Sequence, residues 1–164
     1  MNREVIISDT SPIFSLALID KLHILAQLFS EVYIAKAVWE ELTRDTNTSY
    51  YQNIVDFFQR KVKKITGFND LTFVMDYGES ESVILYKELN ADFLLIDDLK
   101  ARRIAENFNV KCIGTIGLLS IAKENGLITE LKPLFETFLN HRRYYSLNLL
   151  NAILKQQGEP ILVL

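Results

Sequence analysis

Acidic residues follow two apolar runs of this sequence, at the point where each run ends. Asp9 follows the run 5–7, and the pair Asp97 and Asp98 follows the run 93–96. In α/β folds, ligands bind beyond the carboxyl ends of the parallel strands, where the loops open. If these runs are neighbouring strands, the three carboxylates belong to one site at that edge of the sheet.

Further acids lie in segments whose apolar residues have helical spacing. Glu41 belongs to VWEELTR, and Glu79 and Glu81 belong to DYGESESVILYKE. Carboxylates that are brought together repel one another, and a divalent cation relieves that repulsion. Oxygen ligands of this kind suit Mg²⁺ or Mn²⁺. We therefore expect a metal site if these helices reach the same edge of the sheet.

Each acid also has a purely structural interpretation. Asp9 and Asp98 precede predicted helices and are suited to cap their N-termini. Glu41 fits the solvated face of a helix. Taken singly, the structural interpretation is favoured for each acid. Taken together, the acids favour a shared site, because capping does not explain why they recur after apolar strands.

The elements that must position these acids alternate along the chain. The short apolar runs EVIIS, SEVYIA, DFLLID and VKCIG predict strands. Helices are predicted for KAVWEELTR, NIVDFFQRKV, ESESVILYKEL and LKARRIAENF. TIGLLSIAKEN predicts another helix, closed by Gly126, and further helices begin near Leu131 and Leu147. This order predicts one α/β domain over 1–164 around a mainly parallel sheet, with C-terminal helices within 131–157.

Composition limits the class of function. The 164 residues, 49% of them hydrophobic, suffice for one buried core. A formal net charge of −3 argues against coating nucleic acid by bulk positive charge, yet it is compatible with a nuclease whose acids hold metal. The single cysteine, Cys112, permits no internal disulfide. No window has the length of a membrane-spanning helix, so we expect a cytoplasmic protein without a membrane partner.

Four segments, in order over about Val5 to Leu134, resemble the PIN-domain nucleases in the branch close to VapC-type toxins. They are IISDTSPIFSLA, AVWEEL, YGESESVILYKEL and LLIDDLKARRIAENFNVKCIGTIGLLSIAKENGLI. Their combination is specific, whereas any one of them alone is weak. The resemblance implies a three-layer α/β/α fold. It also implies cleavage of RNA with Mg²⁺ or Mn²⁺ held by four acids.

The resemblance also implies which residues act. The four acids match Asp9, Glu41, Glu79 and Asp98. Asp9 and Asp98 are the expected direct metal ligands, and Glu79 is expected to bind the metal directly or through water. Glu41 is expected to act as a ligand or as a base through water.

Two assignments stay open at this point. Typical members have Asp as the third acid, and Glu81 is an alternative to Glu79 for that place. Asp97 is an alternative to Asp98 as the fourth acid and as a metal ligand. Glu is longer than Asp by one methylene, so a site built for Asp would hold the metal differently or weakly. The alternative function is therefore a catalytically weak PIN fold that binds a partner.

Other polar residues have supporting roles. By the resemblance, Ser11 supports the first acid and Thr115 supplies a hydroxyl near the metal. Arg102 lies one helical turn after Asp98. An ion pair between these two residues is favoured over a contact of Arg102 with substrate phosphate.

The partners follow from the same resemblance. They are an RNA substrate, a small antitoxin protein and a second copy of the chain in a homodimer. The basic stretches RKVKK and HRRYY are interpreted as solvated faces rather than RNA-binding surfaces. His23 and His141 are interpreted as packing and surface residues rather than catalysts.

Overall fold

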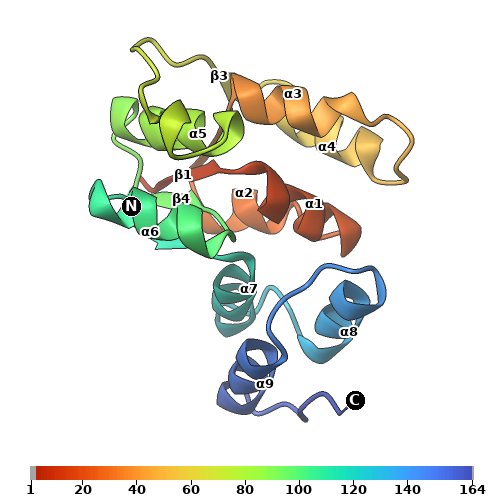
Figure 1. Ribbon diagram of the computed structural model, residues 1–164. Helices are drawn as coiled ribbons and strands as arrows, with labels where there is room; N and C mark the ends of the chain where they lie inside the picture. The colour runs from red at the N-terminus through yellow and green to blue at the C-terminus, as the bar shows by residue number, and fades with distance from the viewer. Residues whose placement is uncertain (1–2, 164) are drawn as a thin grey trace. The chain divides into compact units, whose positions relative to one another are not determined.

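The structure is a computed structural model that describes residues 3–163 (Figure 1). The chain divides between Gly114 and Thr115 into two compact units. The first unit contains the sheet, and the described part of the second is helical. One domain over 1–164 stays a prediction.

The first unit is built on a parallel sheet. Its five strands have the order β3-β2-β1-β4-β5, and each neighbouring pair is parallel. The strands are β1 (Val5–Ser8), β2 (Glu31–Ala35), β3 (Val62–Lys63), β4 (Phe93–Leu95) and β5 (Cys112–Ile113). The four predicted runs all contain strands, which confirms the predicted parallel sheet.

The central strand β1 explains why an acid follows an apolar run. Ile6 and Ile7 are wholly buried, and β1 pairs with β2 on one side and with β4 on the other. A strand covered on both faces needs a continuous apolar sequence rather than an alternating one. The first polar side chain that can reach an open edge therefore comes where the strand ends.

The strand β3 differs from the sequence prediction. NIVDFFQRKV was predicted as one helix, but α4 (Tyr51–Phe58) ends at Phe58 and the chain then pairs with β2. The N–H of Ile34 donates to the carbonyl of Lys61 at 3.0 Å, next to the pairing of Ile34 with Val62. Pairing with a neighbouring strand therefore overrides the helical spacing of this segment.

Helices cover both faces of the sheet, which gives the three-layer α/β/α fold. In Figure 1, α3 (Lys36–Arg44), α4 and α5 (Tyr77–Glu88) lie above the strands, and α2 (Ile24–Leu28) and α6 (Leu99–Asn107) lie below them. The helix α1 (Thr10–Leu18) follows β1, and a short 3₁₀ helix, η1 (Leu71–Phe73), precedes α5. Helix α5 contacts β1, β2, β4 and α3. The acids carried by α3 and α5 thus lie in one layer.

The second unit contains the helices α7 (Thr115–Glu124), α8 (Lys132–Asn140) and α9 (Leu147–Gln156). Gly126 has a φ of 76°, and the N–H of Leu127 donates to the carbonyl of Ala122 at 2.9 Å. This is the glycine-dependent helix end that the sequence predicts. Across residues 3–163, no helix combines the length and apolar character needed to cross a membrane.

Candidate functional site

Asp9 lies at the carboxyl end of β1 and is only 6% exposed. Its backbone N–H donates to the carbonyl of Leu95 at 2.9 Å, which ties it to the neighbouring strand β4. Helix α1 begins at the next residue, yet in the described chain the Asp9 side chain makes no capping hydrogen bond. Asp9 therefore occupies the N-cap position of α1 without the side-chain hydrogen bond of a cap, and capping does not explain its burial.

Gly78, in the first turn of α5, allows two carboxylates to approach each other. A Cβ built on Gly78 would lie 2.6 Å from Oε1 of Glu41 and 3.4 Å from Oδ1 of Asp9. Both oxygens therefore border the space that a side chain at position 78 would need. Because Glu41 comes from α3 and Asp9 from the end of β1, three elements meet at this point.

Asp76 and Glu79 form a reciprocal cap at the start of α5. Oδ1 of Asp76 accepts a hydrogen bond from the N–H of Glu79 at 2.8 Å, and the Glu79 carboxylate accepts one from the N–H of Asp76 at 3.4 Å. This capping box fixes Glu79 at the helix end that points toward Asp9. Asp76 was not predicted from the sequence, although an acid three residues before Glu at a helix start is a recognisable signal.

The pKa values of two carboxyls reflect their crowding. Burial raises the pKa of Asp9 to about 7, and the negative charges of Glu79, Asp76 and Glu41 also raise it. Burial raises the pKa of Glu79 to about 7 as well, with further repulsion from Asp76 and Asp98. The four predicted acids are thus linked through the fields that they exert on one another.

Asp98 is the N-cap of α6, as the structural interpretation predicts. Its Oδ1 accepts a hydrogen bond from the N–H of Ala101 at 2.8 Å. The cap uses one carboxylate oxygen, and the second oxygen takes no part in it. Capping and metal binding are therefore compatible for this residue.

The favoured ion pair between Asp98 and Arg102 is wrong. Within residues 3–163, Arg102 instead forms a long pair with Glu106, with Nε and Oε1 4.0 Å apart. A guanidinium NH1 of Arg102 and Oδ1 of Asp97 lie 3.2 and 3.3 Å from the position of a Cβ on Gly114. Asp98 is engaged in the cap of α6, where it binds the backbone. Arg102 lies beside Asp97 instead.

Glu81 has a structural contact of its own. Its Oε1 accepts a hydrogen bond from the N–H of Ala37 at 3.2 Å, at the N-terminus of α3, where Ala35 offers no side-chain cap. Because α3 carries Glu41, this contact helps to hold Glu41 in place. It also favours Glu79, rather than Glu81, as the acid that faces Asp9.

The remaining predicted residues keep their assigned roles as predictions. Ser11 is half-buried in the first turn of α1, and Thr115 begins α7 in the second unit and is buried. Thr10 was not predicted as a site residue. Its Oγ1 is the one buried side-chain nitrogen or oxygen atom in residues 3–163 without a hydrogen-bond partner.

The chemistry of the donor set fits a divalent cation. Asp9, Glu41, Glu79 and Asp98 supply hard carboxylate oxygens, which Mg²⁺ and Mn²⁺ prefer. As the side chains stand, no three Asp, Glu, His or Cys residues of the described part are close enough to hold an ion together. Binding of one ion by three of these carboxylates therefore requires rotations of their side chains.

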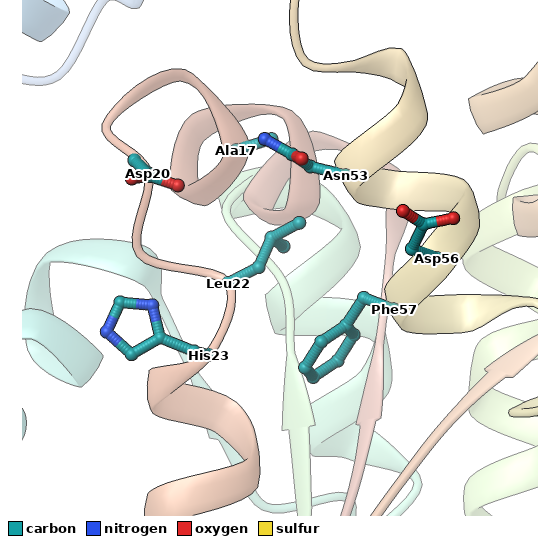
Figure 2. Close-up of a pocket in the computed structure, with 7 residues that line it drawn as sticks. All are labelled: Ala17, Asp20, Leu22, His23, Asn53, Asp56 and Phe57. Carbon is teal, nitrogen blue, oxygen red and sulfur yellow. The ribbon is translucent and has the colours of Figure 1, made fainter.

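A separate pocket of about 330 Å³ lies between the segment after α1 and helix α4 (Figure 2). It is lined by Ala17, Asp20, Leu22, His23, Asn53, Asp56 and Phe57. Figure 2 shows Leu22 and Phe57 facing the space between the two segments. His23 is exposed, so its interpretation as a packing residue is wrong. The lining includes none of the predicted site residues.

Comparison with known proteins agrees with the fold. A family model described as PIN domain matches residues 5–159. A search of curated proteins gave no match. The matched region covers most of the 164 residues and includes every strand of the parallel sheet. The chain therefore belongs to the PIN-domain family, whose fold is of the nuclease type.

Proposed function

We propose that this protein is a metal-dependent ribonuclease that hydrolyses RNA phosphodiesters. The observation that carries the proposal is the approach of Asp9 and Glu41 to each other at Gly78, beside the capping box of Glu79. Three elements distant in sequence bring these carboxylates to the carboxyl end of β1, where the charges of Glu79 and Glu41 act on the buried Asp9. Family membership supports the nuclease class.

The residues divide the work between holding an ion and handling a proton. Asp9, Asp98 and Glu79 would hold Mg²⁺ or Mn²⁺. When bound, the ion supplies Lewis-acid polarisation of the phosphodiester and makes a water molecule more acidic. Glu41 is half-buried beside Asp9 and accepts the proton of the attacking water.

The test is cleavage of a mixed single-stranded RNA with Mn²⁺, compared with EDTA. Wild type should cleave only with metal, and Asp9→Asn should lower the rate by about 100-fold or more, because losing the metal removes several kcal/mol of transition-state stabilisation. Asp20→Asn is the matched control, because it removes the same charge from an exposed position. Unchanged cleavage by Asp9→Asn, in a variant that a thermal melt shows to be folded, would refute the site.

The finer part of this proposal is a role as the toxin of a toxin–antitoxin pair. The protein would be a homodimer in a reducing cytosol, and its partner would be a small antitoxin. Expression of wild type should arrest growth of a bacterial host, and Asp9→Asn should not. Arrest by both proteins would separate toxicity from the site.

A second candidate is a catalytically weak PIN fold that binds a partner. The separation of the carboxylates favours it, because no three of them are placed to hold an ion as they stand in residues 3–163. Calorimetric titration with Mn²⁺ distinguishes the two candidates. Absence of binding at millimolar Mn²⁺ would support the binding module.

A further inference from the structure

A second cavity lies next to the acids, between α3 and the start of α5. Its volume is about 350 Å³, within the range of ligand pockets. The residues of its lining that matter here are Lys36, Glu40, Glu41, Arg44, Tyr77 and Glu81. Glu41 also borders Gly78 together with Asp9, so the cavity shares this residue with the candidate active site.

Tyr77 is the aromatic residue of this lining. Its side chain is 67% exposed, and it directly precedes Gly78 at the start of α5. The segment just before it exposes two more rings, those of Phe68 and Phe73. Large aromatic rings exposed beside an active site are suited to stack on unpaired nucleic-acid bases.

The charges of the lining are unevenly compensated. Lys36 pairs with Glu40 at 3.8 Å, and the Glu81 carboxylate accepts from the N–H of Ala37. Arg44 is exposed and forms no ion pair with any residue of 3–163. Its guanidinium therefore remains available at the rim, and its planar fork matches the geometry of a phosphate group.

We infer that this cavity is a binding subsite for one nucleotide of single-stranded RNA next to the scissile phosphate. The base stacks on Tyr77, and the flanking phosphate pairs with Arg44. The inference rests on the proposed function, since it places the subsite beside the acids that would cut. A flexible single strand fits because its bases are unstacked, whereas a duplex keeps its bases out of reach of Tyr77.

The test is binding of a fluorescein-labelled twelve-nucleotide oligouridylate to the full chain in EDTA, followed by fluorescence anisotropy. Without metal, binding is measured apart from cleavage. Tyr77→Ala should raise Kd about tenfold, and Tyr77→Phe should stay within about twofold of wild type, because stacking needs the ring and not the hydroxyl. Arg44→Ala should raise Kd about fivefold and reduce the salt dependence of binding.

Matched controls come from α6 and from Phe108, the residue that follows it. Phe108→Ala removes an aromatic ring that is 45% exposed, and Arg103→Ala removes an exposed cation outside the cavity. Neither should change Kd by more than about twofold. Equal losses in the control and cavity variants would show unspecific binding and overturn the subsite.

The outcomes separate the subsite from the proposed function. Cleavage with Mn²⁺, together with wild-type affinity of Tyr77→Ala and Arg44→Ala, would overturn the subsite and leave the ribonuclease intact. Tyr77-dependent RNA binding without cleavage would support the subsite and refute the enzyme. Absence of RNA binding by wild type would overturn the inference. A Tyr77→Ala variant that changes only the oligomeric state would assign this surface to a protein partner and would overturn it as well.

Discussion

Two carboxylates of this chain that are largely withdrawn from water have opposite surroundings, since the Glu159 side chain is 9% exposed and Asp9 is 6% exposed. Glu159, in the second unit, accepts hydrogen bonds from the N–H groups of Leu131 and Lys132 at 2.9 to 3.0 Å and from Nζ of Lys123 at 2.6 Å. Asp9, in the first unit, has the acids Glu79, Asp76 and Glu41 as neighbours, and the N–H of Thr10, which acts to lower its pKa, is outweighed by burial and these charges. Both residues are withdrawn from water, but only Glu159 receives full compensation.

The pKa values follow this difference. Burial acts to raise the pKa of Glu159, but hydrogen bonds from Lys123, Lys132 and Leu131 outweigh it and lower the pKa overall. For Asp9, burial and the neighbouring acids act in the same direction. A compensated buried acid stabilises the fold, whereas an uncompensated one costs stability and is typical of functional sites. The contrast therefore separates a structural acid from a functional one.

Removing the compensated charge should have the largest effect on stability. Glu159→Gln removes the negative charge that pairs with the Lys123 ammonium, which is 18% exposed and keeps its hydrogen bond to the carbonyl of Gln157, and it should lower the free energy of unfolding by about 3 kcal/mol. Urea unfolding at pH 7 measures it, with Glu136→Gln on the exposed face of α8 as the control. A loss of less than about 0.5 kcal/mol, the size typical of surface substitutions, would remove the contrast.

Removing the charge of Asp9 should raise the free energy of unfolding, whereas removing that of Glu159 should lower it. The pKa of Asp9 is about 7 in the folded chain and 3.8 in its ordinary state, so the folded chain binds the extra proton between these values. Stability should therefore fall as pH rises from about 4 to 7, and Asp9→Asn should lack this part of the decline. In EDTA at pH 8 the variant should be more stable by about 2 kcal/mol.

Urea unfolding between pH 4 and pH 8 gives this profile. A remaining slope in Asp9→Asn is expected from Glu79, whose pKa is also raised to about 7. A variant that is less stable than wild type at pH 8 would make Asp9 a structural residue like Glu159.

The two neighbouring acids after β4 should differ in metal affinity. Asp98→Asn should weaken Mn²⁺ binding about tenfold more than Asp97→Asn, because we assign the direct ligand to Asp98 and an orienting role to Asp97. The cap of α6 survives in Asp98→Asn, since an amide oxygen can accept from Ala101. Calorimetric titration decides the matter. If Asp97→Asn weakens Mn²⁺ binding more than Asp98→Asn does, the two residues exchange their roles. If neither variant changes Mn²⁺ binding, Asp98 is only the cap of α6.

Filling the space at Gly78 should have the smallest effect. In Gly78→Ala the new Cβ would lie 2.6 Å from Oε1 of Glu41, so that carboxylate must move and Mn²⁺ affinity should fall a few-fold. The fold should not weaken, since Ala favours a helix over Gly by up to about 1 kcal/mol. Gly67→Ala is the control, because its nearest neighbour would be 3.7 Å away. A loss of stability without a change in Mn²⁺ binding would contradict this account.

The fold was predictable where signals are local. Buried strands and amphipathic helices appear as apolar runs and helical spacing, and Gly126 marks a helix end. The two-residue strand β3 lies between Lys and Arg residues and has no period of its own, so its pairing with β2 decides its conformation.

The site was predictable in its residue types but not in its contacts. Asp9, Glu41 and Glu79 were predicted from their positions and from the family resemblance, with Glu81 as an alternative to Glu79. Three features of the site depend on residues far apart in sequence. They are the absence of a side-chain cap at Asp9, the cap that Glu81 provides for α3, and the space at Gly78 that admits Glu41. Asp76 was within reach, because the capping box is a local pattern.

The central claim, that acids at the carboxyl end of β1 hold a divalent cation, is tested most directly by a crystal structure soaked in Mn²⁺. The account predicts an anomalous difference peak with carboxylate oxygens of Asp9, Asp98 and Glu79 at about 2.1 Å, the distance typical of Mg²⁺ sites, and with Glu41 near it. Asp9→Asn crystals soaked in the same way should lack the peak. No peak in wild type at saturating Mn²⁺, or a peak away from these residues, would contradict the account.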